Sequence, residues 1–585
     1  MQDQTTSKTN SFVKGAFILV MATGLVKAIG ALFKIPLANL LGGEGMGYFS
    51  TAYGLFNPIY AVSVGGFPIA LSSLVSQYAG LGRGADIRKA YQMAWLLFGA
   101  IGLVGFVAIW LLAEPFCAAA GNPGAVLSVR AMAPALLFCC CMSVWRGYHQ
   151  GLGNMVPTAV SQVVEACAKL ALGICGTLWV QRIGLEEFAA SGTVFGAAAA
   201  TEEAAHRLLL PYMAAGAVGG VALSTLCGAI FLLLYQQTAG RRTFYKLRPR
   251  TVPLSGGAVC KALALIALPV CLGAVVVSLT SIIDLFSVMN RLGDAVSADY
   301  AQVAGQYRSA LPPEALPNFL YGSYQGLAAS LYTLLPTLTS SFGVSALPAV
   351  SRAWAAGDAG MARKNAETVL RIALLLTIPA GLGLSVLAEP ILLLLYPARV
   401  AEVAVAAPLL RILGIGGICL GIATPVNSML QAIGRADLPV KLMLVGAAIK
   451  LTLNLTLIGH PSVNILGAPI GSLACYVFLA VSSVTLLCKS LSLRPKAGLL
   501  FRPLLAGGLC AATAGLVHTL AVRVLPGPVA TLGGIALGGA VYLAVLAAVG
   551  GIRPEDLPKG VRKILEDVQK SRKYRRFADG KVKKL

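Results

Sequence analysis

The segment Gly24-Leu-Val-Lys27-Ala-Ile-Gly30-Ala-Leu-Phe-Lys34-Ile-Pro36-Leu37 places two cations deep inside an apolar stretch that begins at Phe12. Lys27 lies about 20 Å along a helix from Lys14, so its charge cannot easily return to the membrane surface near Lys14. Lys27 and Lys34 are seven residues apart and share one helix face. A cation at such depth costs at least about 2.5–3.5 kcal/mol. We predict compensation by a wet cavity or an anionic substrate; the alternatives are an internal ion pair or, for Lys34, snorkelling to the far surface.

The composition is that of an all-α polytopic membrane protein. Of 585 residues, 57% are hydrophobic and only 12% are charged, whereas a soluble protein carries about 25% charged residues. Apolar segments of about 20 residues recur along the whole chain, and each is long enough to span a bilayer as a helix. They predict about fourteen transmembrane helices, at residues 12–36, 47–74, 88–113, 126–148, 156–181, 210–236, 259–286, 322–346, 365–388, 403–426, 438–458, 466–488, 501–523 and 528–550.

The net charge of +23 indicates orientation in a membrane. Lys and Arg concentrate in alternate loops and in the C-terminal segment after Arg553. Under the positive-inside rule, both termini are expected in the cytoplasm. The basic residues lack the aromatic interleaving of a nucleic-acid surface, so no nucleic-acid partner is predicted.

The chain also repeats itself. Ala113-Glu-Pro115 recurs as Ala388-Glu-Pro390, an offset of 275 residues, and Lys169 matches Lys450 at an offset of 281. Six helices are therefore followed by six in the same orientation, a parallel repeat of the kind found in two-lobed transporters. The predicted units are an N-lobe (1–236), a basic cytoplasmic linker (237–258), a C-lobe (259–489), two further helices (490–552) and a basic tail (553–585).

Several chemistries are not indicated. The sequence has no GxxxxGK[ST] phosphate loop, no HExxH and no paired Cys/His cluster, so neither a built-in ATPase nor a metal site is predicted. The acidic pairs Glu186-Glu187 and Glu202-Glu203 are interpreted as solvated charges in a hydrophilic loop, and the Gly-Gly-Glu44-Gly segment as a turn.

A few polar residues lie within predicted helices. Glu165 precedes Lys169 by four residues, the favourable order for an ion pair on one helix face; mutual neutralisation is the preferred interpretation, with a role in transport as the alternative. Lys450 has no acid at the matching position and is a second candidate cavity cation, with Asn454 on its face. Asp284 could bind a coupling cation or pair with a lysine.

Several longer motifs carry a family resemblance. They are Lys27-Ala-Ile-Gly30, Leu41-Gly-Gly-Glu-Gly-Met-Gly47, Gly66-Phe-Pro68, Arg146-Gly-Tyr-His-Gln-Gly-Leu-Gly-Asn154, Pro157-Thr-Ala-Val-Ser-Gln-Val-Val-Glu165 and Leu320-Tyr-Gly-Ser-Tyr-Gln-Gly326. Together they resemble the stage V sporulation protein B family, in the polysaccharide branch of the multidrug/oligosaccharidyl-lipid/polysaccharide (MOP) exporters, which is related to the lipid II flippases of peptidoglycan synthesis.

The resemblance implies a flippase in the bacterial cytoplasmic membrane that moves a polyprenyl-diphosphate-linked oligosaccharide or cell-wall precursor by alternating access. Lys27, Lys34 and Lys450 would then attract the diphosphate, while membrane lipid holds the polyprenyl tail. Enzymes of cell-wall or polysaccharide synthesis are the implied partners. No cofactor is expected. Some relatives bind Na⁺ between helices 7, 11 and 12, so the resemblance leaves coupling to Na⁺ or H⁺ open, although helix 11 has no carboxylate.

Because no bond is made, the predicted protein is not an enzyme. The alternatives are a cation-coupled multidrug antiporter of the same superfamily, which needs acidic cavity residues, and a membrane glycosyltransferase or polymerase. The second needs a catalytic carboxylate at the outer face of an early helix, where Glu44 is the only acid.

Overall fold

The computed structural model describes residues 2–240, 254–493 and 498–550. In these residues thirteen helices are long and apolar enough to cross a membrane. The first of them, residues 21–61, contains two helical segments that meet at Gly42, whose φ of 63° and ψ of −169° are not helical. This break falls in the gap predicted between the first two helices. The prediction of an all-α multi-pass protein is confirmed. Most of the predicted linker and the basic tail lie outside the described residues.

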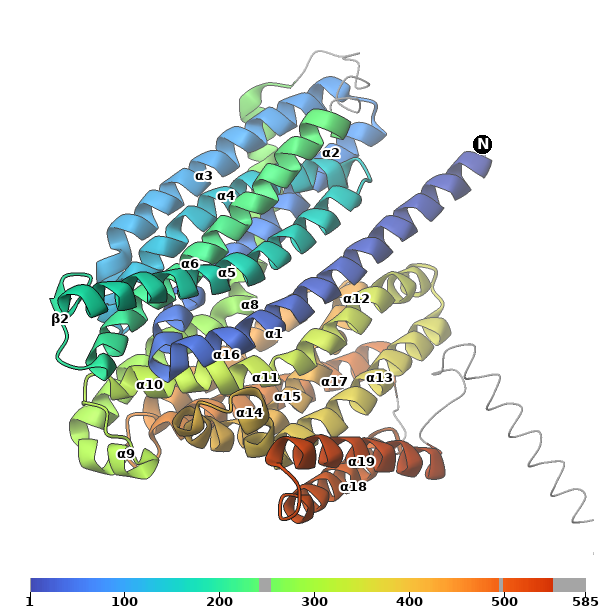
Figure 1. Ribbon diagram of the computed structural model, residues 1–585. Coiled ribbons are helices and arrows are strands. Elements are labelled where there is room, and N and C mark those ends of the chain that lie inside the picture. Colours follow the sequence, from blue (N-terminus) through green and yellow to red (C-terminus); the bar gives the residue numbers. More distant parts are fainter. Residues whose placement is uncertain (1, 241–253, 494–497, 551–585) are drawn as a thin grey trace, which may run out of the picture.

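The N-terminal half, residues 2–240, forms one group of helices. Figure 1 shows α2 to α6 packed together, with α1 running diagonally between them and the other half. Its elements are α1 (Gln2–Ala61), η1 (Val62–Gly66), α2 (Phe67–Gly80), α3 (Gly84–Ala119), η2 (Pro123–Ala125), α4 (Val126–Gly151), α5 (Val156–Ser191), the hairpin β1 (Thr193–Val194) and β2 (Ala197–Ala198), α6 (Glu202–Tyr235) and η3 (Gln236–Gly240).

The C-terminal half, residues 254–493, forms the second group, and α18 and α19 pack beside it against α13 (Figure 1). Its elements are α8 (Gly256–Ala298), α9 (Tyr300–Tyr307), α10 (Leu316–Gly322), η4 (Ser323–Ala328), α11 (Ala329–Tyr332), α12 (Leu334–Ala355), α13 (Ala359–Val386), α14 (Ala388–Leu395), α15 (Val400–Ala432), α16 (Asp437–Leu457), η5 (Asn464–Leu466) and α17 (Gly467–Leu491), followed by α18 (Gly498–Ala521) and α19 (Gly527–Ala548). Helix α8 joins the halves, because it packs on α2 and α3 as well as on α16.

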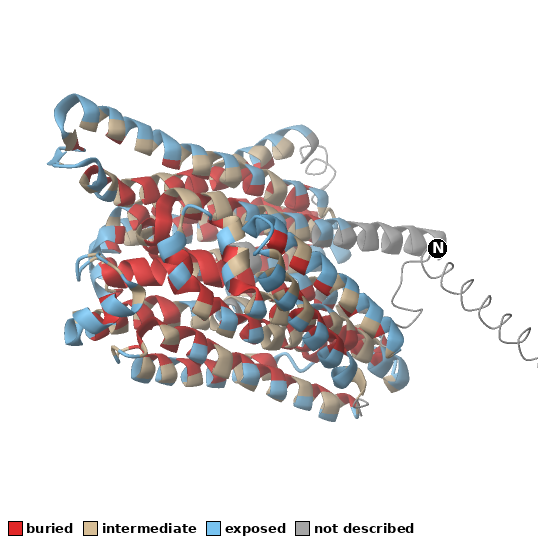
Figure 2. Ribbon diagram, turned by 60° about the horizontal axis from the view of Figure 1, so that its bottom comes forward, coloured by how far each residue is buried: buried red, intermediate tan, exposed pale blue. Residues whose placement is uncertain are grey.

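The distribution of burial fits a lipid surrounding. Figure 2 shows buried residues along the inner helices and exposed ones on the outer faces. Large apolar side chains such as Leu111 and Leu265 are exposed, whereas Arg146 and Lys450 are both 1% exposed. In water, exposed apolar side chains and buried charged ones would both be unfavourable. In a bilayer the apolar faces contact lipid and the charged groups pair inside the protein.

Several helices are longer than their apolar stretches predicted. Helix α5 continues to Ser191, where Gly192 ends it in the left-handed conformation. Glu186 and Glu187 therefore lie on this helix and not in a loop, and Glu186 pairs with Arg182 at 2.8 Å. Glu202 and Glu203 likewise form the first turn of α6, where a helix dipole favours acidic residues. The loop interpretation of both acidic pairs was wrong, because hydropathy marks the membrane-embedded part of a helix and not its end.

The sequence repeat has a structural counterpart. In the N-terminal half Arg130 of α4 pairs with Glu114 of α3 at 2.8 Å. In the C-terminal half Arg411 of α15 pairs with Glu389 of α14 at 3.5 Å. These are the repeat-related residues, so the two halves share an internal contact as well as a sequence pattern.

Candidate functional site

A polar cavity of about 170 Å³ lies between the two halves. Its lining includes residues from helices that are far apart in the sequence: Lys34 and Tyr53 of α1, Asp284 of α8, Tyr332 of α11, Lys450 of α16 and Tyr476 of α17. The structure thus brings together two of the three lysines that we expected to attract a diphosphate.

Lys27, the third lysine, is not part of this cavity lining. It lies seven residues before Lys34, about 10 Å along the helix. Its ammonium group donates a hydrogen bond of 3.0 Å to the hydroxyl of Ser340 on α12. The Ser340 hydroxyl in turn donates to the carbonyl oxygen of Thr337. Lys27 therefore connects α1 to the C-terminal half, a contact that helix periodicity alone could not predict.

Asp284 and Lys450 form a buried ion pair on the cavity wall. The Lys450 ammonium donates to Asp284 Oδ2 at 2.7 Å and to the carbonyl oxygen of Thr280 at 3.3 Å. Asn454 Nδ2 donates to Asp284 Oδ1 at 3.3 Å and to Ser287 Oγ at 2.9 Å. Of the two roles predicted for Asp284, the geometry gives the pairing with a lysine. The spacing of residues along α16 could not reveal this partner of Lys450, because the acid comes from α8.

This arrangement does not fit a sodium site. Sodium requires oxygen ligands directed at a common point, as other hard cations do. Here both carboxylate oxygens of Asp284 face hydrogen-bond donors, the Lys450 ammonium and the Asn454 amide nitrogen. An ammonium group already supplies the positive charge that a bound cation would bring.

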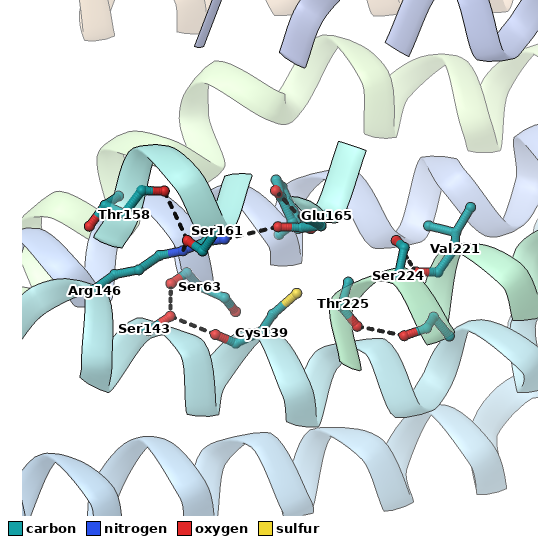
Figure 3. A network of polar contacts seen from close by, with 12 residues as sticks. Ser63, Cys139, Ser143, Arg146, Thr158, Ser161, Glu165, Val221, Ser224 and Thr225 are labelled. Carbon is teal, nitrogen blue, oxygen red and sulfur yellow. Dashed lines mark hydrogen bonds and ion pairs between the residues drawn. The ribbon is translucent and has the colours of Figure 1, made fainter. Parts of the chain in front are cut away.

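Glu165 does not pair with Lys169, contrary to the preferred interpretation. Arg146 of α4 binds it instead, with 3.0 Å between Arg146 Nη2 and Glu165 Oε2. Arg146 Nε also donates to Ser161 Oγ at 3.0 Å (Figure 3). The Tyr60 hydroxyl donates to Glu165 Oε1 at 3.2 Å. Arg146 prevails because its planar guanidinium satisfies two acceptors at once, and because a fully buried arginine cannot lose its charge.

Lys169 instead lies against two aromatic rings. Its ammonium group is 4.8 Å from the ring centroid of Tyr53 and 5.2 Å from that of Phe33. Both distances are typical of cation–π contacts. Among the residues that the structure describes, Lys169 forms no ion pair. The sequence signal that could have revealed this is Arg146 itself, which stands in a quoted motif within one helix of Glu165.

The Gly42 break is held by two residues of the opposite half. Arg399 donates to the carbonyl oxygens of Asn39 at 2.8 Å and 3.1 Å and of Leu40 at 3.1 Å, and Glu402 accepts from the backbone NH of Gly43 at 3.0 Å. A cation thus caps a helix end and a carboxylate caps the next helix start, the arrangement that helix dipoles favour.

The halves approach each other closely beside this break. A Cβ at Gly322 of α10 would overlap the carbonyl oxygen of Gly43, so only glycine fits there. Glu44 lies within the helix after the break, 3.1 Å from the Tyr48 hydroxyl, and the turn predicted around it is reduced to the single residue Gly42. Sequence reasoning missed Arg399 and Glu402, whose partners are backbone atoms about 360 residues away.

Comparison with known proteins defines the class. The fold is similar to that of the lipid II flippase MurJ in an inward closed conformation, with a TM-score of 0.62 and 15% identity over 91% of this chain and 98% of that one. Residues 324–456 match the family model described as MatE. These likenesses show a multi-pass helical fold of the MATE and MurJ type. Residues 12–354, more than half of the chain, match the model described as polysaccharide biosynthesis protein. The chain therefore belongs to the polysaccharide biosynthesis protein family.

Curated relatives extend this match over most of the chain. Stage V sporulation protein B of Bacillus subtilis (strain 168) is 23% identical over 510 residues, which cover 83% of this chain and 85% of that protein. The lipid II flippase MurJ of the same organism is 24% identical over 462 residues, 77% of this chain and 78% of that one.

Proposed function

We propose that the protein moves a polyprenyl-diphosphate-linked oligosaccharide or cell-wall precursor across the cytoplasmic membrane of a bacterium, with both termini in the cytoplasm. The observation that carries this proposal is Lys34. It lies on the wall of the central cavity and has no ion-pair partner among the described residues. An uncompensated cation in a membrane interior is costly, and a diphosphate group is the compensation that a substrate of this class supplies.

The size of the cavity and the contacts that close it support a mechanism of alternating access. A volume of about 170 Å³ is well below the roughly 300–1,000 Å³ of ordinary ligand pockets. A sugar diphosphate enters only when the two halves separate. The contacts of Arg399 and Glu402 with the Gly42 break, and that of Lys27 with Ser340, join the halves, so they have to open and close during the cycle.

A multidrug antiporter for organic cations fits the cavity less well. Such a substrate needs an available acid, and the one carboxylate in the lining, that of Asp284, is neutralised by Lys450. The polyprenyl tail remains in membrane lipid, and enzymes of cell-wall or polysaccharide synthesis make and consume the substrate.

The test is flipping of a fluorescent polyprenyl-diphosphate sugar in proteoliposomes at matched protein levels. Lys34→Ala is expected to lower the rate at least about tenfold, equivalent to about 1.4 kcal/mol. Lys27→Ala should also impair transport and Lys27→Arg should retain part of it, because charge is kept while geometry changes. Lys441→Ala is the matched control, since Lys441 is exposed and pairs with Asp437 on the surface.

Ser340→Ala separates two roles of Lys27. Equal losses in Lys27→Ala and Ser340→Ala would assign Lys27 to the contact between the halves, whereas a loss only in Lys27→Ala would place its charge on the substrate path. Full activity of both Lys34→Ala and Lys27→Ala would overturn the proposal. Transport of an organic cation that improves in Lys34→Ala would favour the drug antiporter.

A further inference from the structure

Lys169 does not bind the acid that its own helix offers. Glu165, one turn earlier on α5, is engaged by Arg146 at 3.0 Å and by Tyr60 at 3.2 Å. Both of its oxygens therefore have partners without Lys169. In the described part of the chain, no other carboxylate forms an ion pair with Lys169.

The groups that hold Lys169 also border the cavity. Tyr53, whose ring lies 4.8 Å from the ammonium group, lines the cavity together with Lys34. Phe33, the second ring, directly precedes Lys34 on α1. Lys34 thus lines the cavity, Lys169 lies against a ring that lines it, and neither lysine forms an ion pair among the described residues.

We propose that Lys34 and Lys169 together form a two-cation site for the diphosphate, in which Lys169 rests on Phe33 and Tyr53 until the substrate arrives. This inference rests on the proposed function. It adds Lys169 to the residues that bind the diphosphate and specifies the side of the cavity on which the diphosphate binds. The diphosphate binds the α1 side of the cavity, where Lys169 of α5 lies behind Tyr53, and not the wall that carries Asp284 and Lys450.

The distribution of charge determines on which side of the cavity the diphosphate binds. The α8–α16 wall carries Lys450, but Asp284 neutralises it at 2.7 Å. The α1 side carries Lys34 on the cavity wall and Lys169 of α5 behind Tyr53, and neither of them has an ion-pair partner among the described residues. A cation–π contact is weaker than an ion pair and leaves the ammonium protons available. Lys169 can therefore turn from the rings to a phosphate oxygen without leaving a buried acid behind.

The number of charges gives a specific test. A diphosphate monoester has two phosphoryl groups for two lysines, whereas a monophosphate has one. The measurement is isothermal titration of the purified full-length protein in detergent with farnesyl diphosphate and with farnesyl monophosphate. Lys169→Gln is expected to lower affinity for the diphosphate at least tenfold and for the monophosphate less than threefold. Lys169→Arg should keep diphosphate affinity within about threefold, because the charge and the ring contacts are retained.

Lys441→Gln is the control for a general loss of charge, because Lys441 is exposed and pairs with Asp437, so both affinities should stay unchanged. Lys169→Met serves if Lys169→Gln does not fold, since it keeps the apolar stem against the rings. Wild-type affinity for the diphosphate in a folded Lys169→Gln or Lys169→Met protein overturns this inference alone. No binding of farnesyl diphosphate by the wild-type protein overturns both it and the proposed function.

Discussion

Lys169 and Lys450 occupy equivalent positions in the two halves of the repeat, yet their surroundings differ. Lys450 forms an ion pair with Asp284 at 2.7 Å, whereas Lys169 lies on the rings of Phe33 and Tyr53. Lys169 lies on α5 and Lys450 on α16, the two helices that the 281-residue offset aligns. The difference arises because α8 supplies an acid to one of them, while in the other half the nearby acid is bound by an arginine.

This comparison shows that two halves with the same helix arrangement can differ in how their buried charges are paired. The pair of Arg146 and Glu165 lies inside the N-terminal half and is absent from the lining of the central cavity. The pair of Asp284 and Lys450 lies on the cavity wall itself. One pair therefore stabilises a half, and the other sets the charge of the cavity wall. The cavity becomes positive on the α1 side and neutral on the α8 side.

The largest effect is expected where the comparison depends on Arg146. Arg146→Met leaves Glu165 buried without its partner, which typically costs about 3–5 kcal/mol. The double variant Arg146→Met with Glu165→Gln should regain most of that stability, because neither position then carries a buried charge that has lost its partner. Denaturant unfolding in detergent measures both. Arg182→Ala, which breaks an exposed pair, is the control and should cost about 0–1 kcal/mol.

A different result for Arg146→Met would break the comparison. If this variant keeps wild-type stability, Glu165 has turned to Lys169, and the two repeat-related lysines then both carry an acid partner. If Arg146→Met keeps its stability but no longer binds the diphosphate, Lys169 has been taken from the substrate site by Glu165.

A smaller effect is expected for the cavity pair. Lys450→Met strands Asp284, but this carboxylate borders a polar cavity that water can enter, and Asn454 still donates to it. We expect a loss of about 2 kcal/mol, in the range for an unsatisfied buried polar group and below that for Arg146→Met. Unfolding under identical conditions tests the order of the two. A larger loss for Lys450→Met than for Arg146→Met would contradict the assignment of structural and cavity roles.

Much of the architecture was predictable, because every helix that spans a lipid bilayer needs a long apolar stretch, and such stretches can be seen directly in the sequence. The apolar stretches, the repeat and the gap around Gly42 all follow from the sequence. The interior charges were located correctly as well, but their partners were not. A one-dimensional rule pairs Glu165 with the lysine four residues later, whereas Arg146 arrives from the preceding helix. Partners such as Asp284 for Lys450 depend on helix rotation and packing, which apolar periodicity leaves open.

The smallest effect concerns sodium, where the comparison predicts no response from the wild-type protein. The Lys450 ammonium occupies the place beside Asp284 and the Thr280 carbonyl where a cation would bind. Replacing potassium chloride by sodium chloride at equal ionic strength should therefore leave the melting temperature unchanged.

In Lys450→Gln the ammonium is gone, and the new amide oxygen joins the Asp284 carboxylate and the Thr280 carbonyl as a third oxygen ligand. Sodium at ten times its Kd would then add about 1.4 kcal/mol by mass action. Asp284→Asn combined with Lys450→Gln removes the charge and should abolish the sodium response. If sodium stabilises the wild-type protein and Lys450→Gln equally, the cation binds elsewhere, and Lys450 does not act as its built-in replacement.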